Sequence, residues 1–158
     1  MWTRSAILGF LAALAAVAPA AAAAPSLKIQ VTSVAVSITP HDLAPKGASK
    51  GDTVVYRDRL VNVKAQFGKK RGAVVGSDQG TMTFTGPHTA TFAGIATLPK
   101  GTLTLKGPVT ALPNGGLTIP VVGGSGRYAK AHGTLTVGPG QDRVLNTYTV
   151  AFATLPVA

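Results

Sequence analysis

Apolar and polar residues alternate along most of the chain from about residue 27 onward, with the period of a β-strand. Thr and β-branched residues occupy one phase and apolar residues the other, as in Thr134-Leu135-Thr136-Val137. This pattern is typical of strands that bury one face. Helical periodicity is absent from the same region. The sequence therefore predicts an all-β domain.

Segments that contain Gly or Pro divide this region into about eight runs. Gly123-Gly124 is one such segment, and the links at 98–102 and 112–117 are short enough for hairpins. Eight antiparallel strands can close into a β-barrel, whose interior is either filled or wide enough for one small ligand. A β-sandwich is the alternative. We expect strands near residues 27–39, 52–66, 72–85, 89–98, 102–111, 117–122, 133–137 and 143–153.

The first 23 residues have the organisation of a secretory signal peptide. Arg4 supplies a positive charge, an apolar run covers residues 7–17, and a proline and several alanines follow. The run is shorter than the about 20 apolar residues of a membrane span. We predict cleavage after Ala23 and a secreted, extracellular domain over residues 24–158, with an uncleaved anchor as the alternative.

The composition restricts how this domain is held together and what it binds. It has no Cys, so it relies on its apolar core and its sheet hydrogen bonds. Fifteen Lys and Arg face five Asp, and removal of Arg4 with the signal leaves fourteen against five, or +9. The cations are scattered and the aromatics few, which argues against nucleic acid and leaves an anionic cell-surface polymer as a candidate partner. Lys69-Lys70-Arg71 is predicted to be a solvated hairpin tip, with a surface-binding patch as the alternative.

One Gly-rich segment follows an apolar run and reads Gly123-Gly124-Ser125-Gly126-Arg127-Tyr128-Ala129-Lys130-Ala131-His132-Gly133. It resembles a motif of dirigent-type proteins, in which an apolar strand is followed by Gly-Gly-Thr/Ser-Gly, any residue, an aromatic, two residues and Ala-Arg-Gly. Features in the same order as in the family precede it here, from Gly51-Asp52 and Asp58-Arg59-Leu60 to a hairpin at 96–107, so the resemblance covers about residues 51–153.

The chain thus resembles a secreted bacterial member of the allene oxide cyclase barrel-like and dirigent-like superfamily. The resemblance implies an eight-stranded antiparallel β-barrel with a mostly apolar cavity, and a homotrimer. Plant dirigent proteins steer the coupling of phenoxy radicals, allene oxide cyclases close a fatty-acid epoxide into a ring, and bacterial relatives include natural-product cyclases. The resemblance therefore implies a small apolar or phenolic ligand that is held for cyclisation or coupling. Whether the chain is an enzyme stays open.

Alternation along the strands places two acids on apolar faces. Asp58 shares its face with Val54, Tyr56 and Leu60, while its arginine neighbours lie on the other face. An Asp on an apolar face is costly unless it is hydrogen-bonded or used. We expect both acids to point into the barrel as acid/base or charge-stabilising groups, with bonds to turn amides as the alternative. The second acid, Asp78, is predicted to share a face with Val74, Met82 and Phe84.

The family motif adds further candidates. Arg127 and His132 occupy positions where plant dirigent proteins have an acid and an Arg, which departs from the plant chemistry. His132 can exchange a proton with a ligand near neutral pH or act as a structural donor. The predicted catalytic residues are therefore Asp58, Asp78, Arg127 and His132, and the predicted ligand-binding residues are Tyr56, Met82, Phe84 and Tyr128, the last with a core plug as its alternative.

Other kinds of chemistry find little support in the sequence. The histidines, at positions 41, 88 and 132, have no metal-ligand spacing, and we predict neither a metal nor a cofactor. Gly124-Ser125-Gly126 lacks the flanking pattern of a hydrolase nucleophile. The glycines are predicted to allow a sharp turn and close packing where a Cβ would clash.

Overall fold

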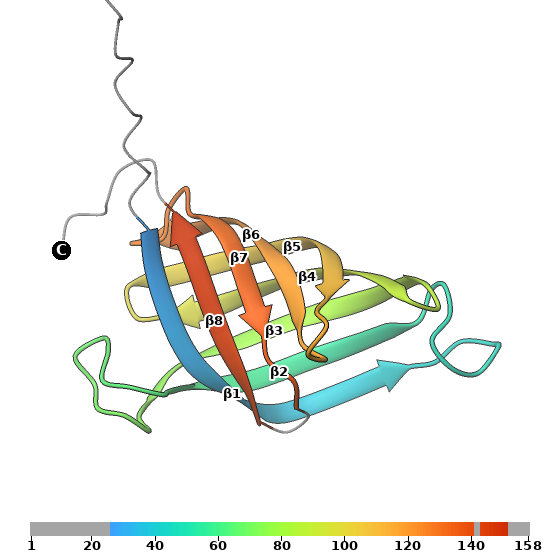
Figure 1. Ribbon diagram of the computed structural model, residues 1–158, viewed down its shortest axis with the longest axis horizontal. Helices are drawn as coiled ribbons and strands as arrows, with labels where there is room; N and C mark the ends of the chain where they lie inside the picture. The colour runs from blue at the N-terminus through green and yellow to red at the C-terminus, as the bar shows by residue number, and fades with distance from the viewer. Residues whose placement is uncertain (1–25, 141–142, 152–158) are drawn as a thin grey trace, which may run out of the picture.

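The computed structural model describes residues 26–140 and 143–151, which form a closed barrel of eight antiparallel strands (Figure 1). Each strand pairs with the next in sequence, and the last pairs with the first. The predicted barrel is confirmed and the sandwich is excluded, whereas the predicted signal peptide over residues 1–23 lies outside the described residues. The strands are β1 (Ser26–His41), β2 (Thr53–Asn62), β3 (Val74–Gly86), β4 (Thr89–Leu98), β5 (Gly101–Ala111), β6 (Leu117–Gly126), β7 (His132–Val137) and β8 (Arg143–Ala151).

The loop between β2 and β3 is closed by one buried side chain. Strand β2 ends at Asn62 and not at residue 66, because the Asn62 Nδ2 donates to the carbonyl oxygens of Gln66 and Lys69 at 3.0 and 3.2 Å. These bonds satisfy the backbone of a tight loop that the alternation of the sequence could not distinguish from strand. The predicted hairpin tip at Lys69-Lys70-Arg71 is confirmed, since all three residues are exposed in this loop.

Strand β6 continues through the glycines that were expected to end it. Gly123 pairs with Thr104 of β5, and Gly126 pairs with Gly101. A Cβ at Gly124 would overlap the carbonyl oxygens of Thr102 and Tyr128. Here glycine permits the close approach of two backbones and does not interrupt the strand.

A bulge changes the face of one predicted residue. Leu60 of β2 pairs with Gly76, whereas Val61 pairs with Val74, so Val75 is the extra residue of β3. Val75 is therefore buried, at 5% exposure, and Val74 is 50% exposed. The prediction that Val74 shares the inner face of Asp78 is wrong, because alternation along a strand reverses at a bulge.

The two ends of the barrel are built differently, and we name them by what they contain. At the closed end, the β4–β5 turn and the β6–β7 connection surround the Tyr128 side chain. At the open end, β1 runs beyond Val34, where its pairing with β8 stops, as far as His41 (Figure 1). The buried apolar core is Ile29, Val31, Leu60, Val75, Ala96, Leu98, Leu103, Leu105, Ile119, Val121, Tyr128, Ala131, Leu135, Tyr148 and Val150.

Candidate functional site

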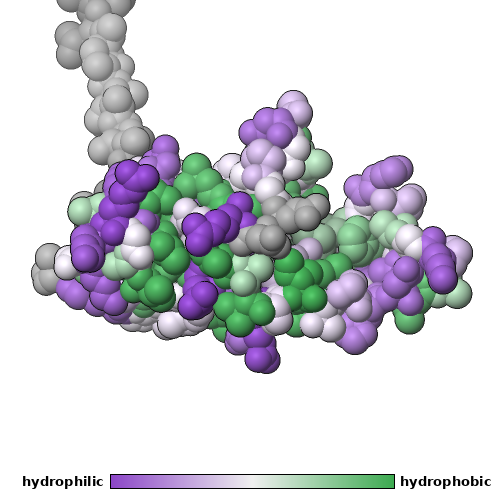
Figure 2. Space-filling view, turned by 90° about the horizontal axis from the view of Figure 1, so that it is seen from below, coloured by the Kyte–Doolittle hydropathy of each residue, from purple (hydrophilic) through white to green (hydrophobic). Residues whose placement is uncertain are grey.

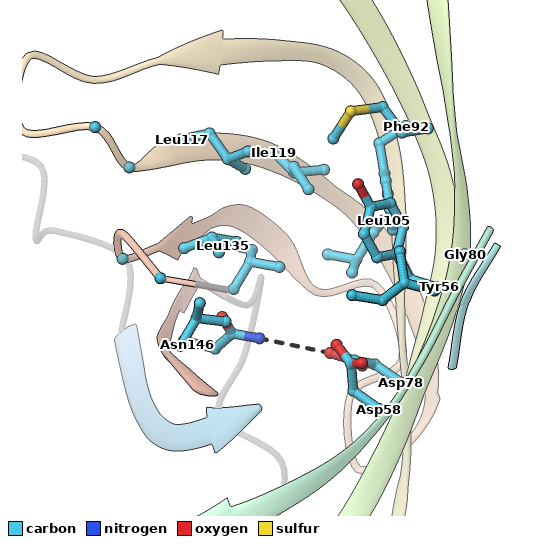
Figure 3. A pocket seen from close by; sticks show the side chains of 18 residues that line it. Tyr56, Asp58, Asp78, Gly80, Phe92, Leu105, Leu117, Ile119, Leu135 and Asn146 are labelled. Atoms are coloured by element: carbon cyan, nitrogen blue, oxygen red, sulfur yellow. Dashed lines mark hydrogen bonds between the residues drawn. The ribbon is translucent and has the colours of Figure 1, made fainter. Parts of the chain in front are cut away.

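A cavity of about 210 Å³ occupies the open end of the barrel (Figure 3). Its wall is mostly apolar, and Ile38, 45% exposed, lies at its mouth. The volume is somewhat below the common range of about 300–1,000 Å³ for ligand pockets, which favours a small ligand. The lining residues are Ile38, Tyr56, Asp58, Asp78, Gly80, Met82, Phe92, Leu105, Gly115, Gly116, Leu117, Ile119, Leu135, Val137, Gly138, Gly140, Val144 and Asn146.

Two carboxylates lie side by side in this wall. Asp58 of β2 and Asp78 of β3 are directly opposite each other in the sheet register, and both line the cavity (Figure 3). Directly opposite side chains have Cβ atoms about 4.5–5.5 Å apart, so two negative charges here repel each other. The prediction that alternation turns both acids toward the interior is confirmed.

Three side chains from β1 and β8 donate hydrogen bonds to this pair. The Ser33 hydroxyl, only 1% exposed, donates to Asp58 Oδ2 at 2.9 Å. On the other side, Asn146 Nδ2 and the Tyr148 hydroxyl donate to Asp78 Oδ2 at 3.5 and 3.4 Å. The two bonds to Asp78 are long, so they stabilise its anion only weakly.

The surroundings of Asp78 favour its neutral form. Burial raises the pKa of Asp78 from 3.8 to about 7, and the negative charge of Asp58 acts in the same direction. The hydrogen bond from Tyr148 opposes this rise in part. Burial also raises the pKa of the Tyr148 and Tyr56 hydroxyls, so both remain neutral. Asp78 can therefore give up or accept a proton near neutral pH, which is the property of a general acid or base.

Asn146 is a site residue that the sequence analysis missed. It is 3% exposed and lines the cavity, and its Oδ1 has no hydrogen-bond partner within the described residues. Alternation could have identified it, because Asn146 lies two residues before Tyr148 and thus on the apolar phase of β8, just as Asp58 lies on the apolar phase of β2. The sequence analysis also missed Ser33, which has the same kind of position on β1.

An aromatic residue that was not predicted forms the wall above the carboxylates. Phe92 of β4 lies against Gly80 and Gly94, which pair with each other across β3 and β4 (Figure 3). A Cβ on Gly94 would come within 2.6 Å of the Phe92 ring. Of the predicted ligand-binding residues, Tyr56 and Met82 line the cavity with Phe92, whereas Phe84 is not among the lining residues.

The motif residues lie at the closed end, outside the cavity lining. Tyr128 is 0% exposed and its hydroxyl donates to the Pro99 carbonyl oxygen at 3.2 Å, so it plugs the core. The Arg127 backbone N–H donates to the Lys100 carbonyl oxygen at 2.8 Å, and its Nε has no partner within the described residues. His132 is exposed at the start of β7. The structure thus brings Asp58 and Asp78 together and separates them from Arg127 and His132.

Fold and cavity define this protein as a small antiparallel barrel with an interior, acid-containing cavity that is open at one end. Residues 32–151 match the family described as allene oxide cyclase barrel like domain. The chain belongs to this family, which confirms the resemblance seen in the sequence. Among curated proteins, none matches the chain.

Solved structures show the same fold in proteins of several activities. A pyocyanin demethylase is 23% identical, with a TM-score of 0.63 over 78% of this chain and 99% of that one. A pterocarpan synthase dirigent protein is 14% identical, with a TM-score of 0.58 over 80% and 93%. A Diels-Alderase from Streptomyces koyangensis is 16% identical, with a TM-score of 0.58 over 84% and 72%. At these identities the likeness establishes the fold alone.

The described residues contain neither a cluster of metal ligands nor a helix that could span a membrane. Within residues 26–140 and 143–151, no three His, Cys, Asp or Glu side chains gather as metal ligands. In the same ranges, no helix has the length and apolarity needed to cross a membrane. The predicted homotrimer and extracellular location stay predictions.

Proposed function

We propose that this protein binds a small, largely apolar or phenolic molecule in the open end of its barrel and guides its cyclisation or coupling. The observation that carries the proposal is the apolar cavity with Asp58 and Asp78 in its wall. Burial on several sides would hold a flexible ligand in one conformation, which lowers the entropic cost of a ring closure. Secretion, proposed on the signal-like N-terminus, places this activity outside the cell.

The carboxylate pair supplies the polar chemistry of the proposed reaction. With its pKa near 7, Asp78 can protonate a ligand oxygen as a ring bond forms. The resulting carboxylate then takes back a proton from the ring, so the reaction is an isomerisation without loss or gain of atoms. Asp58 stays beside it as a negative charge that stabilises a developing cation. The fold of a dirigent protein and a Diels-Alderase supports such a use of the barrel.

Binding of 4-ethylphenol to the purified chain tests the proposal. We expect saturable binding by isothermal titration calorimetry, and at least a tenfold loss of affinity in Val137→Trp, because Val137 lines the cavity and an indole would fill it. Val122→Trp is the matched control, since Val122 is 53% exposed on the outside of the barrel. Equal affinities in the two variants, or no binding to the unmodified chain, would contradict a ligand site in this cavity.

The outer face supports a second candidate, association with an anionic cell-surface polymer. Val34 of β1 pairs with Arg59 on one side and Arg143 on the other, so two arginines flank it on one face. Hydrophilic groups on the face in Figure 2 lie between apolar patches. We expect retention on dextran sulfate that weakens steeply with salt and falls in Arg59→Gln/Arg143→Gln. Retention that is indifferent to salt would contradict this candidate.

A further inference from the structure

A groove lies on the outer face of the barrel, separate from the interior cavity. Its volume is about 220 Å³. Thr32 and Val34 of β1 line the groove, and they alternate with Val31 and Ser33, whose side chains are buried inside the barrel at 0% and 1% exposure. The groove shares no lining residue with the interior cavity. It is therefore a feature that the proposed reaction does not use.

Two arginines from different parts of the chain line this groove. Arg71 belongs to the β2–β3 loop, and Arg143 is the first residue of β8. The backbone is held at both places, since the Gly72 N–H donates to the Asn62 carbonyl oxygen at 2.8 Å and Arg143 pairs with Val34 of β1. A guanidinium presents a planar set of N–H donors that matches the oxygens of a carboxylate or a phosphate.

The wall of the groove carries positive charge without a nearby acid. Within the described residues, no Asp lines it. Nearby charges dominate the local potential, so the groove favours an anion. The fifth acid of the chain, Asp142, lies outside the described residues. The other four are in the β1–β2 loop or in the interior cavity: Asp42, Asp52, Asp58 and Asp78.

A mostly apolar row of side chains continues from the groove across four neighbouring strands. Thr32 pairs with Val61 on one side and with Leu145 on the other, and Val61 pairs with Val74. The row therefore crosses the outer faces of β3, β2, β1 and β8 (Figure 1). Val74 and Leu145 are 50% and 47% exposed. Single exposed apolar residues are common, but two in one row beside a valine-lined groove indicate a surface that binds apolar material.

The arginines and the apolar row together restrict the class of ligand. An inorganic anion would leave the row exposed to water, and a neutral alkyl compound would leave the guanidinium donors unused. A second copy of the chain is a poor match, because two of its four described acids lie inside its own cavity and few remain to meet the arginines. A molecule with an anionic head and an alkyl chain meets both parts of the surface.

We propose that this groove is a second ligand site, which binds a single-chain alkyl oxyanion, such as an alkyl phosphate, as a monomer. The head accepts hydrogen bonds from Arg71 and Arg143, and the alkyl chain lies on the row that contains Val61 and Leu145. The site is independent of the interior cavity, so both can be occupied at once.

Three probes separate the contributions of head and chain. Octyl phosphate has both, inorganic phosphate has the head alone, and 1-octanol has the chain with a neutral end. Calorimetry with the purified chain, at concentrations below micelle formation, is expected to show octyl phosphate binding at least about tenfold more tightly than either of the others. Inorganic phosphate that binds as tightly as octyl phosphate, or 1-octanol that does so, would overturn the proposal.

A matched pair of double variants tests the arginines. Arg71→Gln/Arg143→Gln is expected to lose at least about tenfold in affinity for octyl phosphate, because both groups that hold the head are removed. Arg57→Gln/Lys106→Gln removes the same charge from exposed residues that do not line the groove, and it should change the affinity less than about twofold. Equal losses in the two double variants would reduce the effect to overall charge and overturn the site.

A second pair of variants tests the alkyl chain. Leu145→Asn is expected to weaken the binding of octyl phosphate by about threefold or more and to leave inorganic phosphate unchanged, because it removes apolar surface beyond the head. Ile95→Asn is the control, since Ile95 is 43% exposed on β4, outside the row. Equal affinities for octyl phosphate in these two variants would contradict the placement of the chain.

Other occupants give different results. Loss of octyl phosphate binding in Val137→Trp would place the probe in the interior cavity, so this inference would fail and the proposed function would stand. Binding to phosphatidylglycerol vesicles without binding of monomeric octyl phosphate would identify the face as a membrane contact. An oligomer that dissociates in Leu145→Asn, seen by sedimentation velocity, again without octyl phosphate binding, would identify it as a contact between copies of the chain. Either result would overturn the proposal.

Discussion

The closed and open ends of the barrel differ in what their connections place inside. At the closed end, the connection between β6 and β7 turns Tyr128 inward, and its side chain is fully buried there. At the open end, the connections place Gly115, Gly116, Gly138 and Gly140 at the cavity wall. The sequence motif that identifies the family lies at the closed end, whereas the acids lie nearer the open one. The most recognisable segment of this chain thus packs the closed end, and the proposed site lies elsewhere.

Truncating a tyrosine at each end gives the largest expected difference. Tyr128→Ala should lower the free energy of unfolding by about 3–5 kcal/mol, because it removes a fully buried aromatic side chain and leaves a void. Tyr56→Ala should cost less than about 2 kcal/mol, because its side chain already borders a cavity. Urea unfolding followed by circular dichroism measures both. Similar losses in the two variants would mean that the open end is as tightly packed as the closed one.

The Asp78 carboxyl at the open end is expected to make the free energy of unfolding depend on pH. Because its pKa rises from 3.8 to about 7 on folding, the folded state holds a proton that the unfolded chain lacks between about pH 4 and 7. Stability therefore falls as pH rises through this window. The rise in pKa corresponds to about 4 kcal/mol as an upper value. We expect Asp78→Asn to be more stable than the original chain by about 2–4 kcal/mol at pH 8 and equal to it below pH 4.

Urea unfolding at several pH values checks this prediction. The Asn variant keeps an acceptor for Asn146 and Tyr148, so the comparison isolates the charge. Asp42→Asn serves as the control for loss of a negative charge at an exposed position. A variant that keeps the original slope of stability between pH 4 and 7 would show that Asp78 is not the titrating group.

The smallest expected difference in stability is between alanine variants of two neighbouring glycines of the motif. Gly124→Ala should destabilise the barrel by about 1–3 kcal/mol, because the added methyl would overlap backbone oxygens of Thr102 and Tyr128 that have little freedom to move. Gly123→Ala should change stability by less than about 0.5 kcal/mol, since its Cβ would meet only Thr104 at 4.0 Å. The thermal midpoint, Tm, of each variant is the measurement. If Gly123→Ala lowered Tm more than Gly124→Ala, the assignment of the tight backbone contact to Gly124 would be wrong.

Local alternation predicted the fold well because a barrel repeats the same inside-outside pattern in every strand. It turned Asp58 and Tyr56 inward and Arg57 outward, as the structure has them. It failed where a single residue is added, as at Val75, because the phase of every residue before the bulge is then reversed. It also passed over Asn146, since a polar residue at the start of a run is easily assigned to the preceding turn.

The sequence by itself determined the strands, the direction of most side chains and the membership in a barrel family, since these depend on neighbouring residues and on a local motif. The tertiary structure decided that Asp58 lies opposite Asp78, because that register depends on the loop held by Asn62 and on a bulge. It also decided which end of the barrel is filled. A cavity is the space left by side chains from strands far apart in the chain, and no local pattern specifies how completely they fill it.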